Sequence, residues 1–328
     1  MSHNRLSLAV EEHGLSLPAE GRLAVFAPRV GYDLSLLPRE RCDVIQPLKP
    51  DFDTFEAAGY AAKVAEEPGT YAAAIVVVPR AKAQARDLIA RAAQVADIVI
   101  VDGQKTDGVD SLYKECRKRG EVLGSFAKAH GRLFWFSGGD FEDWRAGPAR
   151  QIDEGFETRP GVFSADGIDP ASQLLVASLP NKLGRVVADL GAGWGFLSRH
   201  VAARDGVEVM HLVEADHVAL ECARTNVKDA RAQFHWSDAT NFKPGHRVDT
   251  VVMNPPFHTG RKAEPDLGKA FILAAAKMLA PTGQLFMVAN RHLPYEATLR
   301  EAFQQVEEVA GDTRFKVLQA QRPSRTRG

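Results

Sequence analysis

An asparagine, two prolines and a phenylalanine close an apolar run of the sequence at Asn254, Pro255, Pro256 and Phe257. Because proline cannot donate a hydrogen bond to a strand ladder, the two prolines mark where a central strand stops. Open α/β sheets bind their ligands at such carboxyl ends of strands. The side-chain amide of Asn254 and the carbonyl of Pro255 would offer two acceptors in a fixed relation, and Phe257 would offer a face for a planar ring. This pattern predicts a site for a planar exocyclic amine whose nitrogen acts as a nucleophile.

A glycine-rich turn lies earlier in the chain, where the apolar run 186–188 leads into Asp189 and then into Gly191, Gly193 and Gly195. Glycines at alternate positions allow a tight turn and let the backbone approach a ligand closely. In dinucleotide-binding enzymes the spacing is G-x-G-x-x-G, whereas here the third glycine comes one residue earlier. The turn therefore predicts a small-molecule site of another kind, and a turn that binds nothing is the alternative.

An acidic residue, Glu214, stands at the end of the next predicted strand, 207–213. Its position fits the offset of about 20 residues at which an acid accepts the hydroxyls of a ribose after a glycine turn. Capping a helix is the other common role of an acid at a strand end, and Asp216 is better placed for it. We therefore expect Glu214 to bind a ribose and Asp216 to cap the helix that follows.

The order and spacing of these residues resemble the class I S-adenosylmethionine-dependent methyltransferases. The D-x-G-x-G-x-G form of the turn carries the resemblance, together with Asn-Pro-Pro-Phe, the signature of amino-group methyltransferases. It implies that the turn cradles the amino-acid moiety of the cofactor, that Asp238 receives the adenine amine, and that the backbone N–H of Ala239 reaches a ring nitrogen. Taken alone, Asp238 would indicate only a surface loop. The implied cofactor-binding residues are Asp189, Gly191, Gly193, Gly195, Glu214, Asp238 and Ala239.

Further stretches are similar to the ribosomal RNA guanine-N2 methyltransferases. They are GVFS at 161–164, ID at 168–169, SQLL at 172–175, NPPFH at 254–258, VAN at 288–290, LPY at 293–295 and RFKV at 314–317. This resemblance covers about residues 125–320. It implies methyl transfer to the exocyclic N2 of a guanine, with ribosomal RNA or a ribosomal subunit as the partner. By analogy Phe163 and Asp169 close over the cofactor, and a packed aromatic and a helix cap are their alternative roles.

The chemistry at Asn254 would be mainly positioning. The lone pair of an exocyclic amine is delocalised into the ring, so acceptors at Asn254 and Pro255 would hold its hydrogens and favour a more pyramidal nitrogen. Phe257 would hold the ring in line with the methyl donor. The sulfonium methyl of the cofactor is already activated, so no general base is needed before transfer. His258 could take the released proton, although a histidine after a turn more often packs or hydrogen-bonds.

An alternating α/β framework is needed to bring these residues together. In the first half the predicted strands are 23–26, 43–45, 72–78, 98–101 and 131–136, and the predicted helices are 52–66, 81–96 and 111–119. In the second half the predicted strands are 185–190, 207–213, 233–236, 248–253, 284–288 and 314–320, and the predicted helices are 170–178, 196–203, 217–228, 267–278 and 295–303. Such alternation predicts doubly wound, largely parallel sheets.

The hydrophobic periodicity lapses between about residues 137 and 160, which predicts a linker. We therefore expect two doubly wound, Rossmann-like methyltransferase domains, residues 1–150 and 151–328. In the first half no strand is followed by a glycine-rich turn, and Val77, Val78 and Pro79 stand where Asn-Pro-Pro could. The first domain is accordingly expected to be a degenerate copy that positions RNA or the active domain, with a purely structural role as the alternative, and the second domain to be catalytic.

Composition narrows the class of protein. The chain has 328 residues, of which 45% are hydrophobic and 25% charged, as in soluble globular proteins. The net charge of −1 is divided evenly between the halves, so any nucleic-acid footprint must be a local patch. Three scattered cysteines argue against a disulfide framework and a Cys-based zinc site. The first residues lack the apolar core of a signal peptide, and the longest apolar run, 71–78, is too short to span a bilayer. We expect a cytoplasmic protein without a metal.

Other functions remain open at this point. A methyltransferase could act on adenine N6 or on a protein glutamine, although in those groups Asn-Pro-Pro is commonly followed by tyrosine. An RNA-binding assembly factor that has lost catalysis is a different class, against which the intact motifs of the second half argue. A nicotinamide dehydrogenase is disfavoured by the glycine spacing.

Overall fold

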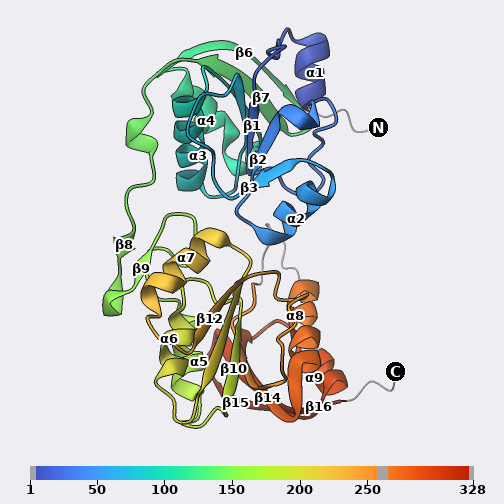
Figure 1. The fold of residues 1–328 in the computed structure, drawn as a ribbon, viewed down its shortest axis with the longest axis vertical. Coiled ribbons are helices and arrows are strands. Elements are labelled where there is room, and N and C mark those ends of the chain that lie inside the picture. Colours follow the sequence, from blue (N-terminus) through green and yellow to red (C-terminus); the bar gives the residue numbers. More distant parts are fainter. Residues whose placement is uncertain (1–4, 257–264, 325–328) are drawn as a thin grey trace. The chain divides into compact units, whose positions relative to one another are not determined.

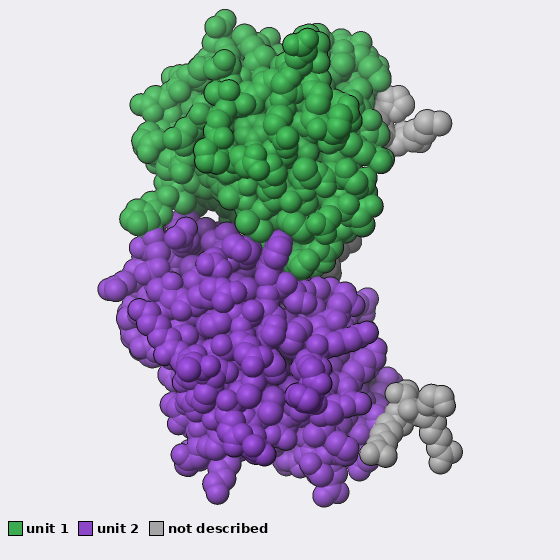
Figure 2. Space-filling model, in the orientation of Figure 1, with its two compact units in different colours: residues 1–148 green, residues 149–328 purple. Residues whose placement is uncertain are grey.

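The computed structural model describes residues 5–256 and 265–324, so Phe257 and His258 lie outside the described residues (Figure 1). The chain divides into two compact units, Met1–Pro148 and Ala149–Gly328, which we call unit 1 and unit 2 (Figure 2). Within the described ranges, no helix is both long and apolar enough to span a membrane.

Unit 1 is a seven-stranded sheet with helices on both faces (Figure 1). Its elements are α1 (Arg5–Glu12), β1 (Leu23–Phe26), η1 (Arg39–Arg41), β2 (Cys42–Ile45), α2 (Lys49–Ala57), β3 (Ala61–Lys63), β4 (Ala73–Val77), α3 (Lys82–Val95), β5 (Ile98–Gln104), η2 (Lys105–Asp107), α4 (Val109–Cys116), β6 (Glu121–Lys128), β7 (Gly131–Ser137) and η3 (Glu142–Trp144). The strand order is β3-β2-β1-β4-β5-β7-β6. The first five strands in this order pair in parallel, whereas β7 and β6 pair antiparallel. One core packs α3 and α4 against the sheet, and the other packs α1 and α2.

Unit 2 begins with a short hairpin and then repeats this architecture (Figure 1). Its elements are β8 (Arg150–Gln151), η4 (Asp153–Gly155), β9 (Glu157–Thr158), α5 (Pro170–Ser178), β10 (Val186–Leu190), α6 (Phe196–Ala202), β11 (Val209–Glu214), α7 (His217–Asn226), β12 (Ala232–Trp236), β13 (Val248–Met253), α8 (Pro265–Met278), β14 (Leu279–Asn290), α9 (Glu296–Ala302), β15 (Phe303–Gly311) and β16 (Phe315–Pro323). The sheet has the order β12-β11-β10-β13-β14-β16-β15. Helices α5, α6 and α7 cover one face, and α8 and α9 cover the other.

The two sheets thus share one strand order, and the predicted fold class of two doubly wound α/β domains is confirmed. Both have inner parallel strands that are buried and apolar, as sheets covered on both faces require. The carboxyl ends of the parallel strands of unit 2 meet at one edge of its sheet. The predicted site residues after β10, β11, β12 and β13 therefore belong to this edge.

One predicted helix is wrong. Helix α2 ends at Ala57, because Gly59 with φ +86° turns the chain back, and β3 then pairs in parallel with β2 in place of the second half of the predicted helix 52–66. The edge strands β6 and β15 were not predicted. Both are mostly exposed or half-buried and lack the apolar runs of the inner strands. The predicted linker contains η3, the hairpin β8–β9 and η4.

Candidate active site

The glycine turn after β10 adopts the backbone conformation that its sequence predicts. Gly191, Gly193 and Gly195 have φ of +75°, +55° and +90°, a region that favours glycine. At Gly195 an added Cβ would lie 2.8 Å from Cγ2 of Val227, so this glycine lets α6 pack closely on α7. At Gly193 an added Cβ would meet nothing within 4 Å. The first glycine therefore makes the bend, the last permits packing, and Gly193 borders open space.

Asp189 is a buried carboxyl at the end of β10, only 3% exposed. The hydroxyl of Ser198 on α6 donates to its Oδ2 at 2.7 Å, whereas its Oδ1 is buried and has no hydrogen-bond partner among the described residues. Burial raises the pKa of Asp189 to about 7, because removal from water disfavours the charged form. An orphaned buried acceptor of this kind fits a ligand that brings hydrogen-bond donors or positive charge.

Glu214 closes back onto the glycine turn. Its Oε2 accepts from the backbone N–H of Gly193 at 2.7 Å, and its Oε1 accepts from the N–H of Asp216 at 2.8 Å. Burial raises its pKa to about 7 in spite of these two bonds. Asp216 itself accepts from the N–H of Val218 at 2.9 Å, so its predicted role as the cap of α7 is confirmed. Glu214 therefore lies directly beside the turn, as a residue that shares a ligand with it must.

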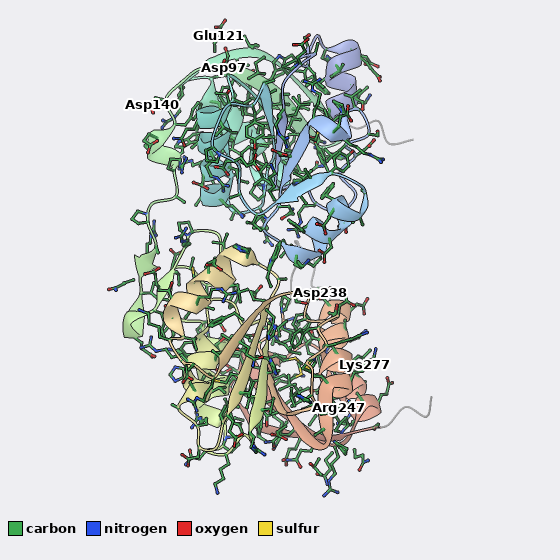
Figure 3. The ribbon with its side chains drawn as sticks, in the orientation of Figure 1. Asp97, Glu121, Asp140, Asp238, Arg247 and Lys277 are labelled. Atoms are coloured by element: carbon green, nitrogen blue, oxygen red, sulfur yellow. The ribbon has the colours of Figure 1, made fainter. Side chains whose placement is uncertain are left out.

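Asp238 organises the loop after β12. Its Oδ1 accepts from the backbone and the hydroxyl of Thr240, at 2.8 and 2.7 Å, and its Oδ2 accepts from the side chain of Asn241 at 3.0 Å. The next residue, Ala239, is buried at 3% exposure. Figure 3 shows Asp238 at the end of unit 2 opposite to Arg247, which precedes β13. Asp238 thus belongs to the carboxyl edge of the sheet, with its carboxylate engaged in the loop's own turn.

Asn254 follows β13 with its carboxamide fixed in one orientation. Its Nδ2 donates to Oδ2 of Asp169 and to the hydroxyl of Ser172, both at 2.9 Å. Its Oδ1 is buried and has no partner among the described residues. The following Pro255 is buried and Pro256 is exposed, whereas the predicted stacking residue Phe257 lies outside the described residues. The side chain of Asn254 therefore offers an unused acceptor.

One cavity of unit 2 is lined by both the glycine turn and Asn254. Gly191, Gly193 and Asn254 belong to its lining, as do Phe163 and Asp169 from the segment before α5 and Ser172 from α5 itself. Phe163 is 61% exposed, and its carbonyl accepts from the indole N–H of Trp194 in the glycine turn at 2.8 Å. The structure thus brings two separately predicted motifs to one cavity. Of the other predicted cofactor-binding residues, none belongs to its lining: Asp189, Gly195, Glu214, Asp238 and Ala239.

Sequence reasoning missed three of the side chains that support this site. Ser172 and Ser198 hold the carboxamide of Asn254 and the carboxyl of Asp189, and Trp194 holds the segment that carries Phe163. Serines on helices are common and carry no signal of their own. A usable signal was the spacing of Ser172, three residues after Asp169 at the start of a helix, which places both side chains on one face.

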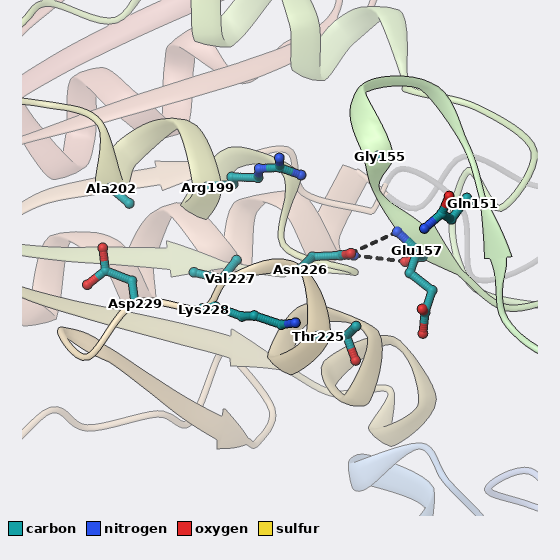
Figure 4. Close-up of a pocket in the computed structure, with 10 residues that line it drawn as sticks. All are labelled: Gln151, Gly155, Glu157, Arg199, Ala202, Thr225, Asn226, Val227, Lys228 and Asp229. Atoms are coloured by element: carbon teal, nitrogen blue, oxygen red, sulfur yellow. Dashed lines mark hydrogen bonds between the residues drawn. The ribbon is translucent and has the colours of Figure 1, made fainter.

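Asn226, at the end of α7, ties the hairpin β8–β9 to the glycine turn. Its Oδ1 accepts from the N–H of Glu157 at 2.7 Å, and its Nδ2 donates to the carbonyls of Glu157 and Trp194, both at 2.8 Å. Figure 4 shows the two bonds to Glu157 at the side of an open hollow, which Arg199 and Lys228 also line. Acidic side chains line the same hollow, so it has no single charge preference.

Unit 1 has a counterpart of this turn, which the hydrogen bonds identify. The N–H of Ala27 donates to the carbonyl of Ile45 at 2.9 Å, just as the N–H of Gly191 donates to that of Val213 at 2.9 Å. Ala27 also shares the positive φ of Gly191, at +53°. The two turns therefore start from the same bend after the first strand of each sheet.

Beyond this bend the two turns differ in polarity. Gln46 stands one residue after Ile45, where Glu214 stands in unit 2, and its Nε2 donates to the carbonyl of Pro28 at 2.7 Å. In unit 2 the corresponding peptide group instead presents the N–H of Gly193 to Glu214. An amide has thus replaced the carboxylate, and the peptide facing it is reversed.

The end of β4 also lacks a polar side chain that the end of β13 has. Val25 pairs with Ile75 in unit 1, as its counterpart Asp189 pairs with Val252 in unit 2. Val77 and Asn254, each two residues further along the chain, therefore occupy the same position. Valine offers no side-chain acceptor. Unit 1 therefore lacks both the carboxylate and the carboxamide that unit 2 has at these positions.

No group of three or more histidine, cysteine or acidic side chains within the described ranges is arranged to hold a metal. His211 and His235 do lie together, with Nδ1 of the first 3.0 Å from Nε2 of the second. Burial lowers the pKa of both. This pair belongs to neighbouring strands and packs on Phe242.

Comparison with known proteins gives matches over both units. The methyltransferase small domain family matches residues 153–319. Ribosomal RNA small subunit methyltransferase C of Hahella chejuensis is 31% identical over 250 residues, which cover 72% of this chain and 72% of that protein. Ribosomal RNA large subunit methyltransferase G of Shewanella amazonensis is 33% identical over 165 residues, 48% of this chain but only 43% of that protein. This chain therefore spans less than half the length of the large-subunit relative.

A solved structure is similar over nearly the whole chain. It is the T. thermophilus 16S rRNA N2 G1207 methyltransferase RsmC in complex with AdoMet and guanosine, with a TM-score of 0.78 and 27% sequence identity. The match covers 94% of this chain and 90% of that one.

Proposed function

The chain belongs to the methyltransferase small domain family of S-adenosylmethionine-dependent methyltransferases, and we propose that it transfers a methyl group to the exocyclic N2 of a guanine in ribosomal RNA. The observation that carries the proposal is Asn254, which lines the same cavity as the glycine turn and whose buried Oδ1 has no hydrogen-bond partner among the described residues. A guanine amine brings two donor hydrogens to such an acceptor. The similar T. thermophilus enzyme was solved with AdoMet and guanosine, which supports the same pair of ligands here.

The residues around the glycine turn fit S-adenosylmethionine. Asp189, Gly191, Gly193, Gly195, Glu214, Asp238 and Ala239 would hold the cofactor. The fit rests on the orphaned Oδ1 of Asp189, which suits a positively charged amino-acid moiety, and on the open space at Gly193. Glu214 is placed to accept ribose hydroxyls once its bond to the turn is exchanged. When bound, the cofactor supplies a methyl group on a positively charged sulfur.

The residues after β13 would orient the guanine. Oδ1 of Asn254 and the carbonyl of Pro255 accept hydrogen bonds from the amine, which localises the lone pair on its nitrogen, and Phe257 stacks on the ring. The rate gain comes from orientation and from acceptors fixed before the reaction begins. The proton that the amine loses leaves after the N–C bond has formed, so no side chain is needed as a base beforehand.

Unit 1 would serve as a cofactor-free partner domain, residues 1–150 in the division expected from sequence, which helps to position ribosomal RNA or the ribosomal subunit. Its counterpart of the glycine turn supports this assignment. Gln46 and Val77 stand where unit 2 has Glu214 and Asn254. Catalysis would belong to residues 151–328.

Methyl incorporation into ribosomal RNA from a strain without the gene tests the proposal. Purified protein should produce N2-methylguanosine in that RNA, identified by mass mapping after nuclease digestion, and should produce none in RNA from the parent strain. Asn254→Ala should lower the rate about a hundredfold, the usual effect of removing a fixed polar group that stabilises a transition state. The exposed Asn181→Ala in the same unit is the matched control and should retain the wild-type rate.

Product analysis separates the alternatives. Methyl label in adenine would identify adenine N6, and not guanine N2, as the methyl acceptor. Label that protease releases and nuclease does not release would identify a protein glutamine. A chain that shows no heat of binding with S-adenosylmethionine in calorimetry would instead be a non-catalytic RNA-binding assembly factor. Wild-type activity of Asn254→Ala would refute the site itself.

A further inference from the structure

We propose that Asp169 and Ser172, at the start of α5, are positioning residues that hold the carboxamide of Asn254 with its oxygen toward the cavity. The inference rests on the proposed function, because it concerns how the acceptor for the substrate amine is oriented. Both residues also line the cavity, and the role assigned to them here acts through Asn254.

Only one orientation of the Asn254 carboxamide gives both of its N–H groups an acceptor. Oδ2 of Asp169 and the hydroxyl of Ser172 each lie 2.9 Å from Nδ2 of Asn254, and the planar amide has only two hydrogens to donate. Both are thus used on the helix side, and Oδ1 is left without a partner among the described residues. The free acceptor at Oδ1 is therefore a consequence of the two acceptors that Nδ2 meets.

The reversed carboxamide would be disfavoured at this position. The last side-chain torsion of asparagine is broad and nearly two-fold, so the backbone alone selects neither orientation. Turning the amide over would set its oxygen against the carboxylate of Asp169, which when ionised can only accept hydrogen bonds. It would also point N–H groups at a substrate amine that is itself a donor. Asp169 thus decides between a carboxamide that binds an amine and one that repels it.

The start of α5 holds both positioning side chains in place. Asp169 caps the helix, since the same Oδ2 accepts from the N–H of Ser172 at 2.8 Å, and Pro170 occupies the first turn. Ser172 is buried at 6% exposure, so its hydroxyl has little freedom to move away. One carboxylate oxygen therefore fixes the helix start and the catalytic carboxamide together.

Two substitutions at 169 separate the cap from the positioning role. Asp169→Asn keeps an oxygen that can cap α5 and accept from Asn254, and should stay within about twofold of the wild-type kcat. Asp169→Ser keeps a capping oxygen but is one bond too short to reach Asn254, and should lower kcat about tenfold with little change in the KM for S-adenosylmethionine. If Asp169 served only as a cap, both variants would be as active as the wild type.

Ser172→Ala gives an independent test that leaves the carboxylate of Asp169 intact. It should also lower kcat several-fold, and together with Asp169→Ser the loss should be less than the product of the two single effects, since both act on one carboxamide. Full kcat in both Asp169→Ser and Ser172→Ala would overturn the proposal. Thermal unfolding of each variant reports whether α5 has kept its cap.

A readout without catalysis distinguishes failure of this inference from failure of the proposed function. In protein labelled with ¹⁵N-asparagine, the side-chain amide hydrogens of Asn254 should exchange slowly with solvent, and faster in Asp169→Ser and Ser172→Ala than in Asp169→Asn. Equal exchange in all of them would overturn the positioning role even if guanine N2 is methylated. Should the wild type methylate another amine, the ranking of the variants on that substrate tests the same role.

Discussion

Replacing Asp189 by asparagine should make unit 2 more stable at alkaline pH and lower its affinity for the cofactor. The carboxyl is 3% exposed, and only its Oδ2 has a partner among the described residues, the hydroxyl of Ser198. Asparagine is nearly isosteric, and its side-chain oxygen can still accept from Ser198. The substitution therefore removes an ionisable group from a buried position while keeping its packing.

The magnitude follows from the pKa of Asp189, which burial raises from 3.8 to about 7. Between these values the folded protein keeps a proton that the unfolded chain has lost, so wild-type stability falls as pH rises and becomes level above about pH 7. The whole window corresponds to about 4 kcal/mol, of which about 2–3 kcal/mol is lost between pH 5 and pH 8. Asp189→Asn has no carboxyl at this position and does not lose this stability. The difference in free energy of unfolding between the variant and the wild type should therefore change by about 2–3 kcal/mol in favour of the variant from pH 5 to pH 8.

Urea unfolding of the full chain at pH 5 and pH 8 measures the free energy of unfolding of the variant and of the wild type. Hydrogen exchange of peptides from β10 then shows whether the difference in stability lies in unit 2. The exposed Asp205→Asn is the control for the change in net charge. Calorimetry with S-adenosylmethionine should show weaker binding by Asp189→Asn at pH 8, where the wild type presents a carboxylate. A stability difference between Asp189→Asn and the wild type that is the same at both pH values would refute the reasoning.

The other predictions concern the two turns. Gln46→Glu should destabilise unit 1 by about 1–3 kcal/mol in urea unfolding at neutral pH, because a carboxylate would then face the carbonyl of Pro28, whereas an unchanged midpoint would contradict the assigned hydrogen bond. Gly195→Ala should destabilise unit 2 by about 1–3 kcal/mol, because φ is +90° and the new Cβ would lie 2.8 Å from Val227. In Gly193→Ala the new Cβ meets no such neighbour, so this variant should lose less stability than Gly195→Ala and more affinity for S-adenosylmethionine. Equal losses of stability and of affinity in the two variants would argue against the roles assigned to these glycines.

Much of the fold could be predicted from the sequence because its inner strands are mostly apolar. The strand Val248–Met253 and the helix Pro170–Ser178 were placed to the residue. The failures lie where the apolar signal is weak. Helix α2 was extended over Ala61–Lys63 because alanine and lysine favour helices, whereas pairing with β2 decides their conformation. The strand β15 lies at a sheet edge and has a mostly polar sequence.

The position of the candidate site could be predicted, but its hydrogen bonds could not. The Asn-Pro-Pro and glycine motifs mark strand ends, and strand order alone brings those ends to one edge. The orientation of the Asn254 carboxamide depends on Asp169, 85 residues earlier in the chain, and no local pattern reports such a contact. The adenine-binding role of Asp238 stays a prediction, and the bonds of its carboxylate to Thr240 and Asn241 are a feature that the sequence did not indicate.

The reversed peptide opposite Gln46 ties the side chain at this position to the turn that faces it. Glutamate at position 46 alone would set a carboxylate against the carbonyl oxygen of Pro28, so that like partial charges would oppose each other. A turn like that of unit 2 would therefore require this side chain, the peptide that faces it and the strand end at Val77 to change together, and no single substitution supplies it.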